Sequence, residues 1–389
     1  MKGTIKQRSE GSWTLRYDVP LGPDGKRRQK TQTIRGTKKD AERELRRILR
    51  EIDTGCHVEP SRMNVGQYLD HWLTDYAKPG VSGKTYERYA QIVEGALKPA
   101  FGGVPLEKLT ALQIQGFYSR ALESGRKDGK GGLSPTTVLQ YHRILRKALQ
   151  QGVKWQLLGR NVADAAEPPR AARPEMEALT LEQTVQLLEA AAGTQYHLPI
   201  LLAATTGLRR GELLALKWED IDLHTGLVRV RRSLEVTREG ITFKPPKTAS
   251  SKRSVTLPSV AIEAVKRHKA KQAQERLLLG AAYENHGMIM ARPDGTVMNP
   301  DHLSWGYAHW IKRRPDLPQV RFHDLRHTYA TALFKQGEHP KLVAALLGHS
   351  SVRTTMDVYS HVQPGMQGDA ANRLDAAFRS AMQVEDRVA

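Results

Sequence analysis

The sequence is almost free of cysteine: Cys56 is the only one in 389 residues. A single cysteine cannot form an intrachain disulfide or build a Cys-rich zinc site, so we expect the chain to work in a reducing compartment. Long hydrophobic runs are lacking too, since the longest apolar stretch, residues 198–204, is far shorter than a membrane-spanning helix. The first residues lack the apolar region of a signal peptide. These absences predict a soluble, cytoplasmic protein with no membrane partner.

Acidic residues are also scarce, with 41 Asp and Glu against 60 Lys and Arg and a formal net charge of +19. Residues 1–55 alone hold 15 Lys and Arg against 8 Asp and Glu, a net charge of +7. Such a charge attracts polyanions, most commonly nucleic acid, although an acidic lipid surface or simple solubility would also account for it. Hydrophobic residues make up 39% of the chain and recur at regular spacing, which indicates a folded protein.

The sequence patterns divide the chain into three expected domains, at residues 1–57, 62–168 and 175–389. Proline-containing segments at 58–63 and 170–174 separate them. We expect a multidomain fold: a small N-terminal β-sheet with one helix, an all-α second domain, and a mainly helical α+β third domain.

The first domain is expected to begin with a hairpin. Apolar and polar residues alternate over 12–19, a Gly-Pro-Asp-Gly turn follows, and a second strand covers 26–34. Thr37 with Asp40 then predicts the start of a helix, which Gly55 ends.

Helix-capping patterns mark the start of several helices in the later domains. Thr110 with Gln113, Ser134 before a proline, and Thr180 with Gln183 are such signals. The third domain also contains strand-like runs, after which helices return from residue 259. The runs cover 227–236, 241–244 and 254–257.

Four separated segments of the third domain hold residue types that bind or attack a phosphate. They are Thr206-Gly207-Leu208-Arg209-Arg210-Gly211-Glu212-Leu213, Pro246-Lys247-Thr248, Phe322-His323-Asp324-Leu325-Arg326-His327-Thr328, and Leu347-Gly348-His349 followed by Tyr359. In these segments, and in their order and approximate spacing, the chain resembles the tyrosine recombinase (phage integrase) family. The two earlier domains are more loosely similar to the arm-binding and core-binding domains of integrases from phages and conjugative elements.

The resemblance implies a tyrosine recombinase catalytic domain with two phosphate-binding arginines, a leaving-group acid on a β-hairpin, auxiliary histidines and a tyrosine nucleophile. In this sequence the matching residues are Arg209 and Arg326, Lys247, His323 and His349, and Tyr359. Glu212 matches an acidic position of the family and is expected to support the pocket. The resemblance implies no metal ion and no other cofactor.

Phosphodiester exchange explains these residue types. Two guanidinium groups can bind the non-bridging oxygens of the charged transition state without a metal ion. A tyrosine attacks poorly near its ordinary pKa of about 10, so arginines and a histidine must stabilise its phenolate and accept or relay its proton. A lysine whose pKa is lowered by nearby guanidinium charge can protonate the departing 5′-oxygen. The product is a 3′-phosphotyrosyl ester, which a second DNA hydroxyl can reverse without ATP.

Neighbouring residues compete for two of these roles. Tyr329 lies three residues after the second arginine and is the rival of Tyr359, although we expect it to pack in the core. Lys244 and Lys252 lie near Lys247, but only Lys247 stands in the Lys-Thr pattern of the family.

Other readings remain open for the arginines and for His323. Arg210 is expected to contact the DNA backbone or to form a surface ion pair. Taken alone, His323 would be a structural histidine, and Arg326 would form a surface ion pair with Asp324 or Glu338.

The resemblance implies double-stranded DNA attachment sites as substrate and a homotetramer in the synaptic complex. DNA-bending proteins and an excisionase are candidate accessory partners, and the location would be the nucleoid of a bacterial host. A helix over 367–382 would dock on a neighbouring protomer. In the first domain, a strand carrying Arg28, Lys30 and Gln32 is a candidate for entry into a DNA groove.

We therefore predict a site-specific DNA recombinase that integrates or excises a mobile element. The alternatives within the enzyme class are a resolvase, an invertase and a type IB topoisomerase. A DNA-binding regulator that has lost catalysis is disfavoured by the complete set of residues from Arg209 to Tyr359. An RNA-binding protein is disfavoured because aromatic-rich RNA motifs are lacking.

Overall fold

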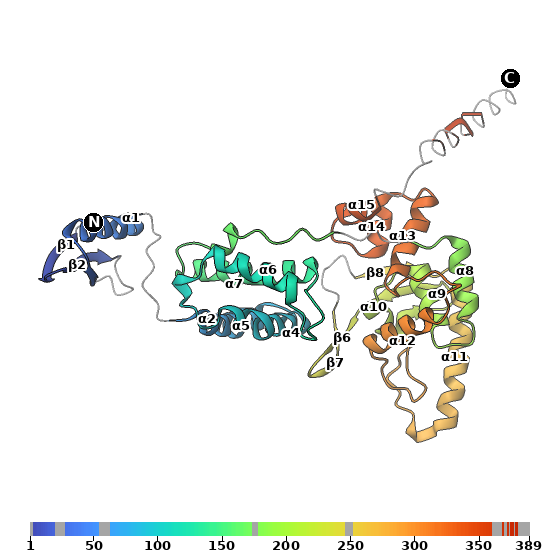
Figure 1. Ribbon diagram of the computed structural model, residues 1–389. Coiled ribbons are helices and arrows are strands. Elements are labelled where there is room, and N and C mark those ends of the chain that lie inside the picture. Colours follow the sequence, from blue (N-terminus) through green and yellow to red (C-terminus); the bar gives the residue numbers. More distant parts are fainter. Residues whose placement is uncertain are drawn as a thin grey trace. The chain divides into compact units, whose positions relative to one another are not determined.

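The computed structural model describes residues 3–19, 28–53, 63–172, 178–245 and 252–359, together with a few residues between 368 and 379. The chain divides into two compact units, Met1–Arg173 and Pro174–Ala389. Figure 1 labels the helices and strands of both. Among the described residues, no helix is long and apolar enough to cross a membrane.

The first unit begins with a three-stranded antiparallel sheet and a helix. The elements are β1 (Gly3–Ser9), β2 (Ser12–Val19), β3 (Arg28–Arg35) and α1 (Lys38–Asp53), with strand order β1-β2-β3. The predicted helix start is confirmed, since the Asp40 N–H donates to Thr37 Oγ1 at 3.3 Å and the Thr37 N–H donates to Asp40 Oδ2 at 3.0 Å. The predicted two-stranded hairpin was incomplete, because it lacked the strand β1. Ile5 is the only large apolar residue of β1, so pairing with β2 defines this strand rather than its own pattern.

One face of this sheet packs against α1. Leu15 and Tyr17 are buried in a cluster with residues of α1. In the strand register Gln32 lies opposite Leu15 and Lys30 opposite Tyr17. Directly opposed residues share a face, so Lys30 and Gln32 lie half-buried on the helix-covered side. Arg28 is opposite Val19 in the backbone register, and its side chain lies outside the described residues.

The other face of the sheet is exposed and polar. Arg16 lies between Thr4 of β1 and Thr31 of β3, and Arg35 is opposite Ser12. Arg16, Thr31 and Arg35 are all exposed. The placement of Lys30 and Gln32 therefore disfavours the prediction that they enter a DNA groove, because the open face carries other residues.

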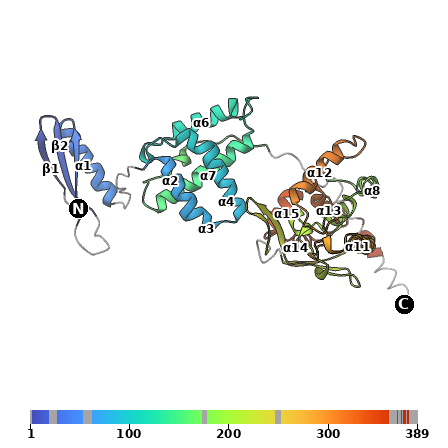
Figure 2. The ribbon, with the colours of Figure 1, turned by 90° about the horizontal axis from the view of Figure 1, so that it is seen from below.

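The rest of the first unit is helical. Its elements are α2 (Val65–His71), a π-helix (Trp72–Ala77), α3 (Lys78–Gly80), α4 (Gly83–Ile92), a second π-helix (Val93–Leu97), α5 (Lys98–Phe101), α6 (Ala111–Ser124) and α7 (Pro135–Lys154), with 3-10 turns at Leu106–Lys108 and Val162–Ala165. Figure 1 shows α6 and α7 on one side and α2, α4 and α5 on the other, and Figure 2 shows the same helices from below. The predicted caps at Thr110 and Ser134 are confirmed. Tyr68, Trp72 and Leu145 lie in the core between the layers.

The second unit combines helices with two small antiparallel sheets. Its helices are α8 (Leu181–Ala190), α9 (His197–Thr206), α10 (Arg210–Leu214), α11 (Ser259–Leu279), α12 (Pro300–Lys312), α13 (Asp324–Lys335), α14 (Pro340–Leu347) and α15 (Val352–Tyr359), with 3-10 turns at Trp218–Asp220 and Gly280–Ala282. Its strands are β4 (Ile221–Asp222), β5 (Leu227–Val230), β6 (Ser233–Thr237), β7 (Gly240–Lys244) and β8 (Arg253–Thr256). The sheets have the orders β4-β5-β8 and β6-β7.

One predicted strand of this unit was wrong. The run 227–236 was expected to be a single strand, but it divides into β5 and β6, which belong to different sheets. Arg231 and Arg232 lie at the division, and both pair with the buried Asp220, Arg232 at 3.2 Å and Arg231 at 3.8 Å. Alternation alone could not reveal this change of sheet, because Val228 and Val230 before it and Leu234 after it all fall on even positions.

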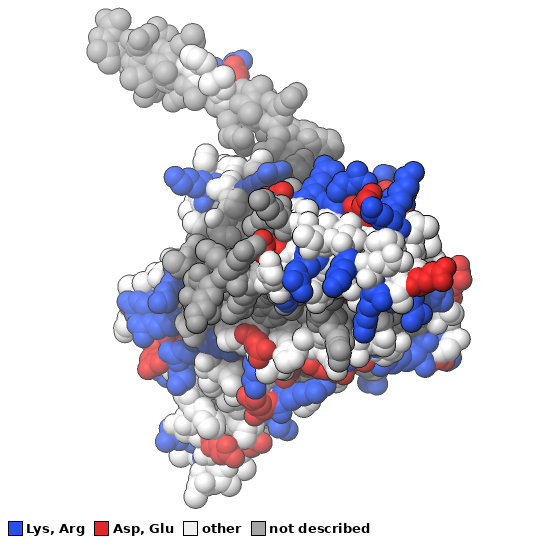
Figure 3. Space-filling view, turned by 90° about the vertical axis from the view of Figure 1, so that its left-hand side faces the viewer, with Lys and Arg blue, Asp and Glu red and all other residues white. Residues whose placement is uncertain are grey.

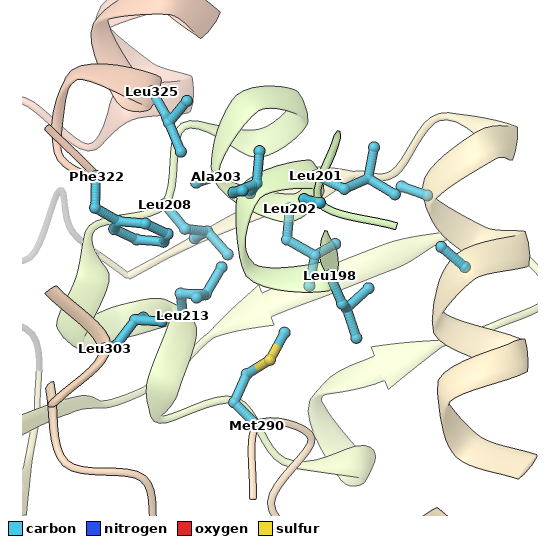
Figure 4. Close-up of a cluster of buried hydrophobic side chains, with 14 of the residues drawn as sticks. Leu198, Leu201, Leu202, Ala203, Leu208, Leu213, Met290, Leu303, Phe322 and Leu325 are labelled. Atoms are coloured by element: carbon cyan, nitrogen blue, oxygen red, sulfur yellow. The ribbon is translucent and has the colours of Figure 1, made fainter. Parts of the chain in front are cut away.

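Helix α9 is the centre of the second unit. It contains the longest apolar run of the chain, and it packs against α8, α10, α11 and α13. Figure 4 shows its Leu198, Leu201, Leu202 and Ala203 among side chains from the surrounding elements. A short helix that is apolar on all sides has to be buried. The buried end of α9 positions the segment that follows it, where the Gly-Leu-Arg-Arg pattern begins.

Candidate active site

The turn after α9 brings Arg209 to the start of α10. Gly207 ends α9 with a φ of 61°, a left-handed conformation that favours glycine, and Leu208 is buried beyond it. The Arg209 N–H donates to Glu212 Oε2 at 2.9 Å, and its Nη1 donates to Glu212 Oε1 at 2.8 Å. Glu212 thus binds both the backbone and the guanidinium of Arg209.

Arg326 lies on α13 and is buried. Its Nη1 donates to the carbonyl oxygen of Gly207 and its Nη2 to that of Leu347, each at 2.6 Å. Asp324 instead binds Arg321, whose Nη2 and Nε donate to its two oxygens at 2.8 and 3.0 Å. This arrangement disfavours a surface ion pair between Arg326 and Asp324.

Three arginines converge on the carboxyl end of α14. Arg253 donates from Nε to the carbonyl of Leu346, Arg326 to that of Leu347, and Arg209 from Nη2 to that of Gly348 at 3.1 Å. These carbonyls belong to the end of a helix, where main-chain acceptors lack helical partners and the helix dipole is negative. The arginines come from β8, α13 and the start of α10, so the tertiary fold assembles them.

His349 follows this cluster directly. Its Nδ1 lies 2.7 Å from the Oγ1 of Thr355, a buried residue of α15. Burial, together with the positive charges of Arg326 and Arg209, lowers the pKa of His349 to about 4. The imidazole is therefore neutral at pH 7, and one of its nitrogen atoms is a proton acceptor.

Two more histidines lie near α13. His323 precedes the helix and its ring meets that of His327 edge-on, with 5.5 Å between the centroids. Although His323 is exposed, loss of part of its hydration lowers its pKa, and the charge of Arg326 adds to this effect. Burial lowers the pKa of His327 to about 4, with a contribution from His323. All three histidines share the positive field of the arginines.

The described residues place the other predicted site residues only in part. Tyr359 is the last residue of α15, ten positions after His349, and its side chain lies outside the described residues. Lys247 also lies outside them, in the segment between β7 and β8. Tyr329 is half-buried against a small cluster that includes Phe334 and Leu347, which supports its expected place in the core.

Arg210 forms one of its two predicted interactions. Its guanidinium binds Asp301 at 3.2 Å and donates to the Ser304 hydroxyl at 2.6 Å and to the carbonyl of Pro300 at 2.9 Å. It thus points to α12, whereas Arg209 points to α14. Among the described residues, no group of three or more His, Cys, Asp or Glu side chains is arranged to hold a metal ion.

The sequence patterns missed two residues of this site, Arg253 and Thr355. Arg253 stands in a run of polar residues, Ser-Lys-Arg-Ser, in which no pattern distinguishes one side chain as a site residue. Thr355 is one of two adjacent threonines. Its position six residues after His349 is a weak signal, because only the packed helix α15 brings the two side chains together.

Known proteins match nearly the whole chain. Residues 177–366 match the phage integrase family model, and residues 64–122 match the phage integrase N-terminal SAM-like domain. The "Tyrosine recombinase XerC-like" protein of Caldanaerobacter subterraneus subsp. tengcongensis is 30% identical over 388 residues, which cover 95% of this chain and 97% of that protein. The chain belongs to the phage integrase family.

A further relative and two solved structures are also similar to this chain. The ICEBs1 integrase of Bacillus subtilis is 28% identical and covers 96% of this chain and 99% of its own length. The Tn1549 transposon integrase in complex with transposon right end DNA has the same fold, with a TM-score of 0.68 at 20% identity over 80% of this chain and all of that one. A lambda integrase dimer bound to a COC′ core site aligns with a TM-score of 0.55 at 19% identity, over 92% of this chain and 96% of that one.

This integrase is therefore a site-specific recombinase of the tyrosine class. Enzymes of this class cut and rejoin DNA with a tyrosine nucleophile and need neither a metal ion nor ATP. The predicted function is confirmed, and the resolvase, invertase and regulator alternatives are not favoured.

Proposed function

We propose that this integrase cleaves DNA with Tyr359 and binds the scissile phosphate with Arg209 and Arg326. The observation that carries the proposal is the convergence of both guanidinium groups on the end of α14, directly before His349. A guanidinium has five N–H donors, and the hydrogen bonds of Arg209 to Glu212 and Gly348 use two of them. Donors left on such a group can bind the non-bridging oxygens of a phosphate.

The first transesterification then runs as follows. The Tyr359 oxygen attacks phosphorus while its proton passes to a neutral histidine, His349 or His323. The P–O5′ bond breaks, and Lys247 gives a proton to the departing oxygen. The products are a 3′-phosphotyrosyl ester and a free 5′-hydroxyl. The two arginines stabilise the extra negative charge of the transition state. A 5′-hydroxyl of another strand reverses the step and completes the exchange.

Two basic surfaces are candidates for holding the DNA. Arg143, Arg146, Lys147 and Lys154 are exposed on one face of α7 and line a hollow there. Asp164 orients Arg146 at 2.7 Å, and the Tyr89 hydroxyl accepts from Lys147 at 3.0 Å. The open face of the N-terminal sheet, with Arg16 and Arg35, is the second surface. In the space-filling view of Figure 3, Lys and Arg side chains cover more of the described surface than Asp and Glu side chains.

The same proposal assigns the chain's larger parts. Residues 1–57 would bind arm sites, 62–168 the core site, and 175–389 would catalyse. Support comes from separate hydrophobic clusters within these ranges. The substrate would be double-stranded attachment sites, and a homotetramer would form the synaptic complex, as described for the lambda integrase tetramer bound to a Holliday junction. DNA-bending proteins and an excisionase are candidate accessory partners.

Covalent trapping tests the proposal. The Tyr359→Phe protein selects its binding site from a pool of randomised duplexes, and a nicked suicide duplex is then built on that site. Incubation with the unaltered protein in EDTA should give a covalent complex on a denaturing gel, and Tyr359→Phe should give none. An adduct that survives in Tyr359→Phe contradicts the assignment and makes Tyr329 the next residue to replace. Specific binding without any adduct would point to a silent regulator.

A further inference from the structure

Glu212 is shared by two arginines of different exposure. Arg209 is 38% exposed at its side chain, whereas Arg253 is 6% exposed and Glu212 itself 3%. Arg253 donates from Nη2 to Glu212 Oε2 at 2.9 Å and from Nη1 to Oε1 at 3.3 Å. One carboxylate therefore joins a guanidinium at the surface of the site to a guanidinium in the interior.

The charge of this cluster depends on Arg253. With both arginines, the cluster has a net charge of +1, and without Arg253 the charges of Arg209 and Glu212 cancel. Burial would raise the pKa of Glu212, but the hydrogen bond and charge of Arg253, followed by those of Arg209, hold it below its ordinary value. A buried carboxylate whose inner partner is removed has to be neutralised by the outer one. Arg253 thus leaves the positive charge of Arg209 available to a substrate.

Arg253 also holds the chain segment before His349. Its Nε donates to the carbonyl of Leu346, and its guanidinium packs against Gly348 so closely that a Cβ there would lie 2.8 Å from Nη1. Gly348 has a φ of 65°, and its carbonyl oxygen accepts a hydrogen bond from Arg209. The same side chain therefore restrains both Arg209, through Glu212, and the turn that leads to His349.

We propose that Arg253 is a positioning residue for DNA cleavage, which neutralises Glu212 and fixes the turn 346–348 so that Arg209 faces the scissile phosphate with its charge intact. The proposal rests on the phosphate-binding role proposed for Arg209. In this role Arg253 acts through Glu212 and the main chain at Leu346. Its contribution is to the rate of cleavage and not to the binding of DNA.

The test compares Arg253→Met with Arg253→Lys in single-turnover cleavage of the nicked duplex described above. Arg253→Met should lower the cleavage rate about 100-fold, as expected for a small misplacement of a catalytic group, and leave the Kd for the duplex unchanged. The cleavage rate of Arg253→Lys should fall between those of the unaltered protein and Arg253→Met, because an ammonium supplies the charge but not two parallel hydrogen bonds. Arg232→Met is the matched control, because Arg232 binds Glu219 and Asp220 outside the site. This variant should cleave at the rate of the unaltered protein.

Two further measurements separate positioning from simple folding. On a duplex with a methylphosphonate at the scissile position, one charged oxygen is absent, so the loss caused by Arg253→Met should shrink. The double variant Glu212→Gln/Arg253→Met removes the carboxylate that Arg253 neutralises and should recover part of the rate. If Arg253→Met does not fold, as judged by its thermal unfolding, Arg253→Lys and the double variant decide.

Either of two results overturns the proposal. One is cleavage by the Arg253 variants at the rate of Arg232→Met. The other is an equal loss on both substrates with no recovery in the double variant, which would show a structural role alone. Failure of the function proposed above is distinct, since the unaltered protein would then form no Tyr359-dependent adduct.

Discussion

Individual side chains at the candidate site are oriented mainly by main-chain oxygen atoms. Arg326 binds the carbonyls of Gly207 and Leu347, and Arg209 binds that of Gly348 as well as Glu212. Each guanidinium is a planar group with several donors, so it can bind the protein on one side and a phosphate on the other. A lysine has one ammonium and could not meet both demands with the same geometry.

Histidine titration gives a prediction at this scale. The pKa of His327 is lowered to about 4 in the folded protein, below its ordinary value near 6.5. Between pH 4 and pH 6.5 the unfolded state binds more protons at this residue than the folded state does. The contribution of His327 to the free energy of unfolding is therefore fully present above pH 6.5 and is lost as the pH falls toward 4. His327→Gln should weaken this decline by at most about 1.4 kcal/mol per pH unit.

Thermal unfolding midpoints between pH 7.5 and 4.5 check this expectation, with His224→Gln as a control at an exposed histidine. An equal pH dependence in His327→Gln and the unaltered protein would contradict it.

Sequence patterns identified most of these residues but not their partners. The Gly-Leu-Arg frame selected Arg209 over Arg210, and the structure is consistent with that choice, because Arg210 turns to Asp301 on α12. No such motif surrounds Arg253 in the sequence. Its importance comes from a buried carboxylate 41 positions earlier in the chain, a separation that no local pattern can register.

Helix ends, rather than helix faces, form the framework of the site. The end of α9, the start of α10, the start of α13 and the end of α14 meet there, and two of these ends are closed by glycines with positive φ. Left-handed backbone at a helix end turns the chain sharply and exposes carbonyl oxygens. Those carbonyls are the ones that bind Arg209 and Arg326.

Gly207→Ala tests this arrangement. A Cβ at Gly207 would lie 2.4 Å from Cδ1 of Tyr329 and 2.8 Å from Cδ2 of Leu347, in addition to the strain of a positive φ. The strain costs about 1–2 kcal/mol and the overpacking about 1–3 kcal/mol, so the substitution should destabilise the protein by about 2–5 kcal/mol. Urea unfolding measures the loss, and cleavage should slow because Arg326 binds the Gly207 carbonyl.

Gly193 provides the matched control. Its φ of 74° is similar, but nothing lies within 4 Å of an added Cβ. Gly193→Ala should therefore cost only the strain, about 1–2 kcal/mol. Equal losses in the two variants would mean that contacts with Tyr329 and Leu347 do not constrain the end of α9.

Elements with strong local signals were predicted well, and elements defined by pairing were not. The helices that begin at Thr37, Thr110, Ser134 and Thr180 have side-chain caps, which depend on residues three positions apart. In contrast, β1 and the division between β5 and β6 depend on partner strands. The open and covered faces of the N-terminal sheet depend in turn on where α1 packs.

At the scale of the whole molecule, the net charge of +19 favours association with DNA. Binding that neutralises phosphates releases counterions, so the affinity falls as salt rises, with a slope of about −0.9 per phosphate contact. The location of the basic residues decides which of them contribute. In the N-terminal sheet, Arg16 and Arg35 lie on the open face and Lys30 on the covered one.

We expect Arg16→Gln/Arg35→Gln to bind arm-site DNA more weakly than the unaltered protein. The slope of log Kobs against log salt should fall by about 0.9 for each lost phosphate contact. Lys30→Gln, on the helix-covered face, should leave the slope unchanged. Fluorescence anisotropy at several salt concentrations measures both, and a loss in Lys30→Gln alone would restore the original prediction for β3.

The sequence by itself determined the class of this protein, because charge, capping signals and four short motifs are local properties that survive without coordinates. It also predicted Arg209, His323, Arg326, His349 and Tyr359 as candidate site residues. The tertiary structure alone decided which groups hold them. Three arginines from distant segments bind the end of one helix, and Glu212 binds two of them. The physical reason is that a buried polar group without a hydrogen-bond partner is destabilising, and only the tertiary fold determines which partners are within reach.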